Sequence, residues 1–392
     1  MNFAIQFKHL ELTVGEKETQ MRSRCKENMS STLGREPCPP NSLQAIVLSD
    51  GKPGHYNQSL GVIQRIPECS YHWVNVNFRS KWRDNLLRVL TCLVGGFRLP
   101  HWLIKGCLRL VLQEEVLEAV AVVDRADLIL STGSSVAAVN LLIGQLFNAK
   151  TVTCRRPSPI GTVYFDLAIL PKMQWPRHDK SNICKTIGVP NQISPEEVNA
   201  QRLQLQADLN LSDGRRMGVL IGGEDRYHTL TEQMANHLIE ALQEVAVKLD
   251  CQLLVTTSRR TLVAVENLIG ARLSDAQCCP ILILAHRDNS LPDPVTTIFA
   301  LSHLIIVTED SFSMVCEAAS SGRRVIILEV DHKTRRRPTH YHVYRELTRR
   351  ASVRWCGIKE LEAHIQQMLS DKTPIKPLQD TQIAATAIQR LF

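Results

Sequence analysis

A histidine and an aspartate, close together in a glycine-bearing loop, are the first residues of this sequence that could perform acid–base chemistry. Asp50 follows the apolar run 45–48, and His55 follows the loop 51–54. Histidine exchanges a proton near neutral pH, whereas an aspartate needs burial to raise its pKa before it acts as a base. We interpret His55 as a general base and Asp50 as its orienter or as an acceptor ligand. In the alternative interpretation the loop is an ordinary turn with His55 in solvent.

Glycines on both sides of Pro53 would let the backbone of this loop approach a ligand closely. The apolar run predicts a strand and the stretch 57–66 predicts a helix, so the loop joins a strand to a helix. Such loops stand at the carboxyl edge of a parallel sheet, where ligands usually bind. We therefore expect a ligand-binding loop that includes Gly51, Lys52, Gly54 and Asn57.

Three later loops carry groups suited to a phosphate. A glycine pair follows the predicted strand 217–221, hydroxyl groups and two arginines follow the strand 252–256, and a serine-containing loop follows the strand 304–307. Arginine offers a bidentate fork to a phosphate, and free N–H groups at a helix N-terminus attract an anion. Glu317 would lie about one turn into the predicted helix 313–320, within reach of a pair of sugar hydroxyls. The alternative is capped helices beside a surface basic pair. The residues predicted to bind this phosphate-bearing ligand are Gly222, Gly223, Thr257, Ser258, Arg259, Arg260, Ser311, Ser313 and Glu317.

Strands and helices alternate along most of the chain, which predicts an α/β fold with parallel, doubly wound sheets. The 392 residues suffice for two domains and two hydrophobic cores. We expect a weakly ordered extension over 1–40, an N-terminal Rossmann-like domain over 41–212, and a C-terminal domain with terminal helices over 213–392. Two such domains facing each other would form a cleft in which two substrates meet.

Several well-known motifs are absent from the sequence. It contains no Walker A motif, no G-x-G-x-x-G fingerprint, no H-E-x-x-H and no D-x-D pair. These absences argue against a kinase-type NTPase, a nicotinamide enzyme and a metal-dependent transferase, and we predict neither a metal nor a cofactor. A nucleotide-sugar epimerase would need a Tyr-x-x-x-Lys pair and a dinucleotide loop, and the sequence shows neither.

Residues 79–112, from Arg79 to Leu112, combine positive charge with aromatic and aliphatic side chains. The stretch contains seven Lys or Arg residues and one acid, and Gly95-Gly96 together with Pro100 divide it into two short helices. Basic amphipathic helices with aromatic side chains lie flat on anionic membrane surfaces. We predict a contact with an anionic membrane through this stretch. The alternative is a pair of core helices with basic outer faces.

Cysteine usage and hydropathy indicate where the protein works. The twelve cysteines include no C-x-x-C pair and mostly lie in apolar runs, which predicts buried free thiols and a reducing compartment. No apolar run is long enough for a transmembrane helix, and no secretory signal is visible near the start. We expect a cytoplasmic protein, peripheral on the inner membrane face or on the cytosolic face of an organelle, with no nucleic-acid partner.

Four blocks of the sequence resemble the signature blocks of one family. They are SDGKPGHYNQSLG at 49–61, VLIGG at 219–223, TTSRRT at 256–261 and VTEDSFSMVCEAASSG at 307–322. Together with a mid-chain block around 178–193, they are similar to the mitochondrial fission "elongated mitochondria" family, whose bacterial members are described as predicted glycosyltransferases. More distantly, the same blocks look like the peptidoglycan N-acetylglucosaminyl transferase and its GT-B relatives.

This resemblance implies a GT-B fold of two facing Rossmann-like domains, with the loop 51–55 on the acceptor side. Glu224 and Asp225 stand where the family has small and basic residues. The implied function is inverting, metal-independent transfer of a sugar from a nucleotide-diphosphate donor to a membrane-associated or envelope glycan or lipid acceptor. The alternative is a non-catalytic, organelle fission-type protein that recruits partners to a membrane surface on a relict GT-B fold. The residues implied to hold the donor are Gly222, Gly223, Ser311, Ser313 and Glu317. We therefore expect 213–392 to be the donor-nucleotide domain, with Thr257, Ser258, Arg259 and Arg260 also binding the donor, and 41–212 to be the acceptor-side domain, with Gly51, Lys52, Gly54 and Asn57 in its acceptor-side loop.

Overall fold

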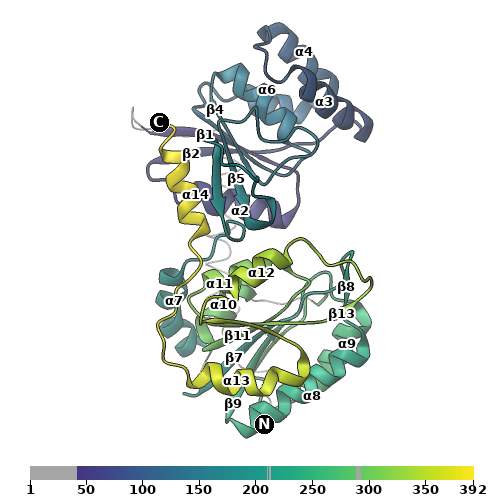
Figure 1. The fold of residues 1–392 in the computed structure, drawn as a ribbon, viewed down its shortest axis with the longest axis vertical. Coiled ribbons are helices and arrows are strands. Elements are labelled where there is room, and N and C mark those ends of the chain that lie inside the picture. Colours follow the sequence, from purple (N-terminus) through teal and green to yellow (C-terminus); the bar gives the residue numbers. More distant parts are fainter. Residues whose placement is uncertain (1–41, 210, 212, 288–292) are drawn as a thin grey trace. The chain divides into compact units, whose positions relative to one another are not determined.

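The structure, a computed structural model, describes residues 42–209, 211, 213–287 and 293–392. Within this part the chain forms two compact units, each built on its own parallel sheet (Figure 1). The predicted weakly ordered extension, 1–40, lies outside the described residues.

The N-terminal unit comprises Asn41–Ile193, Pro338–Arg350 and Lys376–Phe392, and the C-terminal unit includes Ser194–Arg337 and Ala351–Ile375. This division differs from the predicted boundary near 212. The polar helix α7 (Pro195–Asp208) belongs to the C-terminal unit, because it packs against α10 (Pro294–Leu301). The end of the chain was predicted to belong wholly to the second domain, whereas its last helix belongs to the N-terminal unit.

The sheet of the N-terminal unit has six parallel strands in the order β2-β1-β3-β4-β5-β6. Its helices include α2 (Pro53–Gln64), α6 (Ala137–Phe147) and α14 (Asp380–Gln389). The strands are β1 (Leu43–Ser49), β2 (Cys69–Asn75), β3 (Leu128–Thr132), β4 (Lys150–Cys154), β5 (Leu167–Pro171) and β6 (Ile183–Thr186). The other α-helices of this unit are α3 (Lys81–Val94), α4 (His101–Val111), α5 (Glu114–Ala121) and α12 (Tyr341–Leu347).

The sheet of the C-terminal unit also has six parallel strands, in the order β10-β9-β7-β11-β12-β14. A separate antiparallel pair joins β8 (His228–Thr229) to β13 (Asp331–His332). The strands of the main sheet are β7 (Arg215–Leu220), β9 (Cys251–Thr256), β10 (Ile281–Ile283), β11 (Leu304–Thr308), β12 (Arg324–Leu328) and β14 (Val353–Cys356). The remaining α-helices are α8 (Glu232–Lys248), α9 (Val263–Leu273), α11 (Phe312–Ser320) and α13 (Leu361–Ser370).

Both sheets reverse their strand order at one place. In the N-terminal unit the chain builds outward from β1 to β2 and then crosses to β3 on the other side of β1. In the C-terminal unit it builds from β7 through β9 to β10 and then crosses to β11 on the other side of β7. Ligands of doubly wound sheets bind outside the carboxyl ends of the strands at such a point. We therefore expect ligands at the loops after β1 and β3 in one unit, and at the loops after β7 and β11 in the other.

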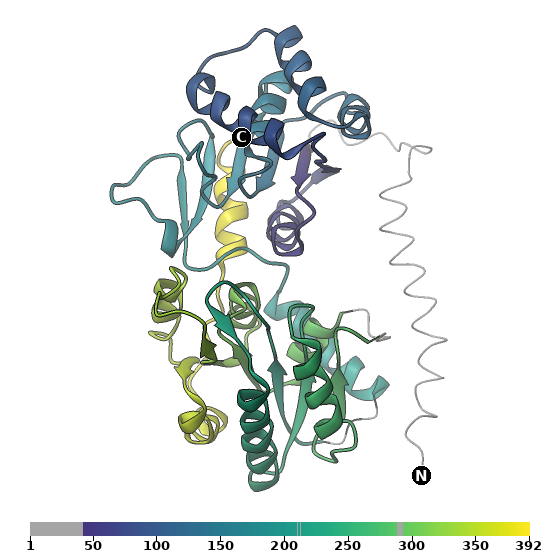
Figure 2. The same ribbon diagram turned by 90° about the vertical axis from the view of Figure 1, so that its right-hand side faces the viewer.

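Buried side chains on both faces explain why these strands are nearly continuous apolar runs. Along β1, Ile46 and Leu48 join a core with α6, whereas Ala45 and Val47 join a core on the opposite face. Helices α2 and α14 cover that second face; Figure 2 shows α14, in yellow, behind the strands of this unit. The C-terminal helix thus completes the core that the first strand begins.

The basic stretch forms the two predicted helices, α3 and α4, separated at the glycine pair and the proline. Among the residues that the structure describes, no helix is both long and apolar enough to cross a membrane. The sequence analysis did not predict α9, α12, β6, β8, β13 or β14. The strands among these have at most four residues, which is too short for a period-two pattern to stand out.

Candidate active site

Asp50 and His55 form a hydrogen-bonded pair at the strand-order reversal of the N-terminal unit. Nδ1 of His55 lies 3.0 Å from Oδ1 and 3.1 Å from Oδ2 of Asp50. A carboxylate accepts hydrogen bonds, so Nδ1 carries the proton and Nε2 of a neutral ring presents its lone pair. The described residues offer Nε2 no hydrogen-bond partner. The predicted pair is therefore brought together, with the ring nitrogen that faces away from Asp50 available to a ligand.

The start of α2 fixes His55 in this position. The helix begins at Pro53, earlier than the predicted start near 57, because proline at the first helical position has a φ angle suited to a helix. His55 consequently lies in the first turn, and its ring packs against the backbone of Gly133. A β-carbon on Gly133 would lie 2.6 Å from the ring, and the residue has a φ of +102°. Only glycine fits this position with the ring in place.

Several donors converge on the Asp50 carboxylate, whose side chain is only 6% exposed. Ser135 Oγ donates to Oδ2 at 2.9 Å, and Lys52 Nζ donates to the same oxygen at 2.8 Å. Burial acts to raise the pKa of Asp50, but the hydrogen bonds from His55, Lys52 and Ser135 outweigh it and hold that pKa well below its usual range. Asp50 is thus held in its ionised form and is a poor proton acceptor.

A pocket of about 530 Å³ opens beside His55. Five cationic side chains and a single carboxylate, that of Asp84, line it, with Asn85, Gln174 and the loop after β3. The cationic residues are Lys52, Lys81, Arg88, Arg155 and Arg156. An excess of positive charge at a partly enclosed site selects an anionic ligand.

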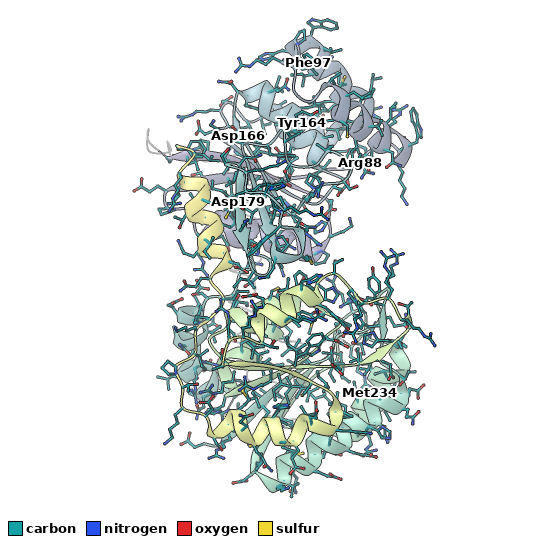
Figure 3. All side chains as sticks on the ribbon, in the orientation of Figure 1. Arg88, Phe97, Tyr164, Asp166, Asp179 and Met234 are labelled. Atoms are coloured by element: carbon teal, nitrogen blue, oxygen red, sulfur yellow. The ribbon has the colours of Figure 1, made fainter. Side chains whose placement is uncertain are left out.

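The pocket cations differ in whether the protein already neutralises them. Arg88, labelled in Figure 3, pairs with Asp84 at 3.1 Å, and Lys52 pairs with Asp50. Neither Lys81 nor Arg156 has a side-chain hydrogen bond or ion pair with any described residue. These two residues were not predicted as site residues, since they lie far apart in sequence on α3 and on the loop after β4. Their charges are available to a ligand.

The other predicted acceptor-side residues do not line this pocket. Asn57 Oδ1 accepts a hydrogen bond of 3.0 Å from Gln192, and the Gly54 carbonyl accepts one of 2.8 Å from Gln58. Gly51 is exposed in the turn before the helix. Of the predicted acceptor-side loop, Lys52 alone reaches the pocket, because the early start of α2 turns the following residues toward other parts of the unit.

Helices α3 and α4 carry large apolar side chains on their surface. Trp102 is 75% exposed and Leu93 is 70% exposed; Phe97, labelled at the top of Figure 3, lies between the two helices in sequence. The other exposed apolar residues here include Trp82, Leu86, Val89, Leu90 and Leu110. Leu87 of α3 and Ile104 and Leu108 of α4 pack into the core, as the alternative of two core helices expects, but their outer faces carry these apolar side chains as well as basic ones.

In the C-terminal unit the glycine pair after β7 is already engaged with the protein. Gly222 N–H donates to Thr308 Oγ1 at 2.7 Å, and Gly223 N–H donates to Asp310 Oδ2 at 2.7 Å. A β-carbon on Gly222 would collide with the Asp310 carboxyl group, and one on Gly223 would collide with the Arg260 backbone. The prediction that these N–H groups bind the donor phosphate is therefore wrong in this structure. The glycines allow close packing of three loops.

In the loop after β9, some side chains bind other parts of the protein and others are available to a ligand. Thr257 is buried, and its hydroxyl donates to Glu266 at 2.6 Å, so it is not placed to bind a donor. Ser258 Oγ accepts from the backbone N–H of Arg260 at 3.1 Å, and the Arg260 guanidinium pairs with Asp310 at 3.1 Å. Arg259 is exposed and has no partner among the described residues. Of the two predicted arginines, Arg259 is the one whose guanidinium is free.

Ser311, Ser313 and Glu317 lie together on α11, as predicted. Ser311 is the N-cap residue, and its side chain makes no capping hydrogen bond. Ser313 is half-buried in the first turn, and Glu317 is largely buried one turn later. The N-terminus of α11 therefore remains a place where an anion can bind.

Asp310 is a carboxylate that the sequence analysis missed. It lies at the strand-order reversal of the C-terminal unit, as Asp50 does in the other unit, and its side chain is almost wholly buried. Burial raises the pKa of Asp310, although the Gly223 N–H acts to lower it. Its Oδ1 has no hydrogen-bond partner among the described groups. The predicted acids Glu224 and Asp225 pair locally, Glu224 with Lys333 at 3.0 Å and Asp225 with His228 at 3.1 Å.

Solved structures of similar fold include two UDP-GlcNAc 2-epimerases. The enzyme from Methanocaldococcus jannaschii aligns with a TM-score of 0.55 at 12% identity, covering 89% of this chain and 99% of that chain. The enzyme from Neisseria meningitidis, bound to UDP-GlcNAc, aligns with a TM-score of 0.51 at 13% identity, again covering 89% and 99%. Two Rossmann-like units with this fold define the GT-B class, which confirms the predicted fold class.

The family follows from the sequence itself. The mitochondrial fission ELM1 family matches residues 53–392, so the chain belongs to this family, and the resemblance of its sequence blocks is confirmed. No protein of curated function matches the sequence.

Proposed function

We propose that this protein is a glycosyltransferase that moves a sugar from a nucleotide-diphosphate donor to a phosphate-bearing lipid or glycan acceptor at a membrane surface. The observation that carries the proposal is the Asp50–His55 pair beside a pocket with uncompensated positive charge. General-base catalysis needs a group within hydrogen-bond reach of the hydroxyl that reacts. His55 Nε2 has this role.

In the proposed reaction His55 Nε2 removes the proton from an acceptor hydroxyl while that oxygen bonds to the anomeric carbon of the sugar. The bond from that carbon to the diphosphate breaks, and its electron pair leaves with the nucleoside diphosphate. A single in-line displacement inverts the anomeric configuration. Asp50 stays ionised and stabilises the imidazolium that forms. No metal takes part in the transfer.

The donor diphosphate is proposed to bind in the C-terminal unit. Since the Gly222 and Gly223 N–H groups are occupied, neutralisation of the leaving group falls to the N-terminus of α11 and to Arg259. Glu317 is one turn into α11, where a carboxylate can accept from sugar hydroxyls. The UDP-GlcNAc bound by the Neisseria meningitidis epimerase supports a nucleotide sugar as the ligand class.

The acceptor is proposed to be anionic and held at a membrane. Lys81 and Arg156 would bind its phosphate in the pocket beside His55. The exposed apolar side chains of α3 and α4, interspersed with Arg83, Lys105 and Arg109, would lie in the interface of an anionic membrane. This arrangement supports a peripheral location, on the inner membrane face or the cytosolic face of an organelle.

Two other functions remain as alternatives. The sequence lacks the Tyr-x-x-x-Lys pair and the dinucleotide loop expected of a nucleotide-sugar epimerase, but the structures of similar fold include epimerases, so these absences do not exclude an epimerase of this fold. The second alternative is a non-catalytic recruitment protein on a relict fold.

Donor binding separates these functions. The full chain is heated with UDP-, GDP-, ADP- and CMP-sugars, and the unfolding temperature is measured for each. A rise with one nucleotide sugar supports the proposal, and no rise with any of them favours the recruitment protein. The nucleotide sugar that binds is then incubated with the protein without an acceptor, and its sugar is examined by NMR. Formation of the 2-epimer would make the protein an epimerase.

A further inference from the structure

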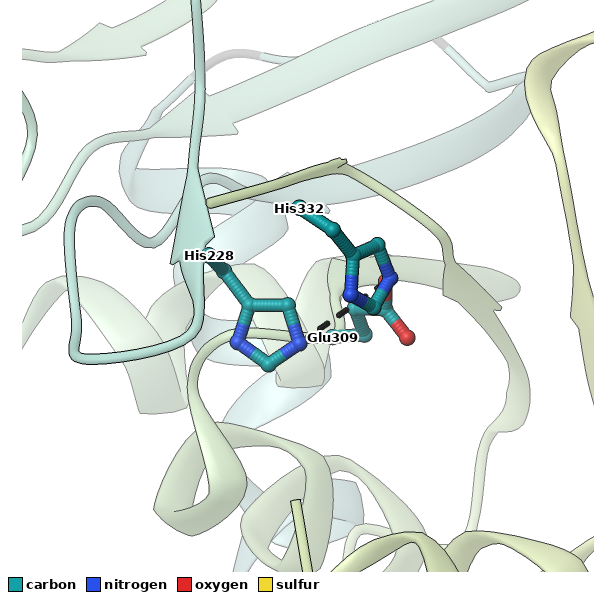
Figure 4. Close-up of side chains that lie close together, drawn as sticks. All are labelled: His228, Glu309 and His332. Carbon is teal, nitrogen blue, oxygen red and sulfur yellow. Dashed lines mark ion pairs between the residues drawn. The ribbon is translucent and has the colours of Figure 1, made fainter. Parts of the chain in front are cut away.

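Two histidines and a glutamate meet in the C-terminal unit (Figure 4). The short strands β8 and β13 place His228 directly opposite His332, and Glu309 directly follows β11. His332 Nε2 lies 3.2 Å from Glu309 Oε1, and His228 Nε2 lies 4.0 Å from the same oxygen. Three side chains from separate segments therefore present ligand atoms that all lie within 4.8 Å of one another.

The orientation of His228 is set by a carboxylate behind it. Its side chain is fully buried, and Nδ1 lies 3.1 Å from Asp225 Oδ1. A carboxylate oxygen accepts hydrogen bonds, so Nδ1 carries the proton and Nε2 of a neutral ring turns its lone pair toward Glu309. Carboxylates orient metal-binding imidazoles in this way.

The Glu309 carboxylate is held from two sides. Its side chain is 0% exposed, Oε1 accepts from the Val330 N–H at 3.1 Å, and Oε2 accepts from Trp355 Nε1 at 3.2 Å. A buried carboxylate that faces an imidazole lone pair is unfavourable unless positive charge lies between them. A protonated imidazole or a metal ion would supply that charge.

We propose that His228, Glu309 and His332 bind one divalent transition-metal ion of the zinc class. Two imidazoles and a carboxylate form a ligand set for zinc, and tetrahedral bonds of roughly 2.1 Å separate ligand atoms by roughly 3.4 Å. The observed 3.2 and 4.0 Å lie on either side of that separation. His332, whose side chain is 38% exposed, leaves a fourth position open to water.

The ion would hold the β8–β13 pair against the end of β11. These strands have two residues each, and so short a pair has few hydrogen bonds of its own. The proposed site rests on no part of the proposed sugar transfer. Loss of the ion would loosen the loops on either side of the pair while the two main sheets stay folded.

Cobalt(II) tests the site directly, because its visible absorption reports the ligands that bind it. The full chain, without an affinity tag, is stripped with a chelator and titrated with Co²⁺. We expect one equivalent to bind with a tetrahedral spectrum that lacks thiolate charge transfer, and Zn²⁺ to displace it. His332→Ala should abolish this stoichiometric binding. Asp225→Asn should weaken it by roughly 10–100-fold, as expected for the loss of an orienting carboxylate.

A second histidine–carboxylate pair of the same unit provides the control. His286 Nδ1 lies 3.1 Å from Glu266 Oε2, with no second histidine in that pair, so His286→Ala should bind Co²⁺ as the unchanged protein does. The unfolding temperature without metal verifies that each variant is folded. No stoichiometric binding by the unchanged protein, or equal binding by His332→Ala, would overturn the proposal and leave a hydrogen-bonded cluster with a protonated imidazole.

Discussion

His55 Nδ1 lies 3.0 Å from Asp50 Oδ1, and that carboxylate also accepts from Lys52 and Ser135. The carboxylate therefore stays ionised and holds the imidazole in one tautomer, in which Nε2 is the ring nitrogen that faces away from Asp50. The same relationship fixes the ring beside the basic pocket, and the first predictions follow from it.

His55→Ala should lower turnover by roughly 10²–10⁴-fold, because it removes the general base. Asp50→Asn should cost less, since the imidazole remains while its orientation and its imidazolium are less well stabilised. Donor binding should survive in both variants, because the proposed donor residues lie in the other unit. Turnover is measured by release of nucleoside diphosphate, and donor affinity by calorimetry.

Gly133→Ala offers a matched variant that removes no polar group. Its β-carbon would displace the His55 ring, so turnover should fall while the pocket charges stay the same. Normal turnover in His55→Ala with an inactive Asp50→Asn would reverse the roles of the two residues. Normal turnover in all three variants would make the loop structural.

Asp50 should also contribute to stability in a pH-dependent way. Its pKa is lower in the folded state than the 3.8 of an unperturbed aspartate, so the folded state binds fewer protons. This contribution is present above about pH 4 and is lost as the pH falls below that value. In urea unfolding, Asp50→Asn should lower the free energy of unfolding by about 1.5–3 kcal/mol near neutral pH, and the difference should shrink in acid. The control is Asp179→Asn, because the Asp179 side chain is 84% exposed. This variant, at the residue labelled in Figure 3, should show little change in the free energy of unfolding at either pH.

The double variant Lys81→Gln, Arg156→Gln should raise the KM for an anionic acceptor by about tenfold or more, because each substitution removes a charge-assisted contact worth about 1.5–3 kcal/mol. The KM for the donor should not change. Arg125→Gln removes a surface cation from the same unit, where Arg125 pairs with Asp127 at 2.9 Å, and should leave both constants unchanged. Equal acceptor KM values in the double variant and in Arg125→Gln would remove the pocket from acceptor binding.

The apolar face of α3 and α4 should attach the protein to membranes. Replacing Leu93, Phe97 and Trp102 by Ser should abolish sedimentation with vesicles that contain anionic lipid, because these exposed side chains would enter the interface. Replacing Arg83 and Arg109 by Gln should remove the preference for anionic over neutral vesicles, and salt should weaken binding of the unchanged protein. Leu203→Ser, at an exposed apolar residue of α7, is the control; if it reduces sedimentation as much, the face is not specific.

Ser311→Ala combined with Glu317→Ala should weaken nucleotide-sugar binding by roughly tenfold or more, since contacts to charged ligand groups are lost. Arg259→Gln should weaken binding as well, whereas Arg260→Gln should mainly lower the unfolding temperature, because Arg260 pairs with Asp310 inside the protein. Calorimetric titration measures the affinities. Unchanged affinity in the double variant would exclude these residues from the donor site.

Much of the fold could be predicted from the sequence because most strands are buried on both faces. Runs such as Leu304–Thr308 have no polar alternation and read directly as parallel strands. The position of the domain boundary could not be predicted. Whether α7 and α14 pack with the sheet nearest in sequence depends on long-range contacts that no local pattern records.

The site was predicted unevenly for a similar physical reason. Asp50 and His55 lie within one loop, so their pairing is local and could be inferred. The glycine pair was misassigned because a close approach by Asp310 and a close approach by a phosphate require the same absence of a side chain. The two histidines of the proposed metal site, His228 and His332, are separated by more than a hundred residues and come together through β8 and β13.

Acceptor-dependent release of nucleoside diphosphate tests the central claim most directly. The protein is incubated with the nucleotide sugar that raises its unfolding temperature, together with vesicles that contain phosphate-bearing lipids from a cell extract. We predict that nucleoside diphosphate is released, that a lipid gains the mass of one sugar, and that His55→Ala reduces both by at least about a hundredfold. Release that is equally fast in His55→Ala, or no sugar gained by any lipid or glycan in the extract, would contradict the account.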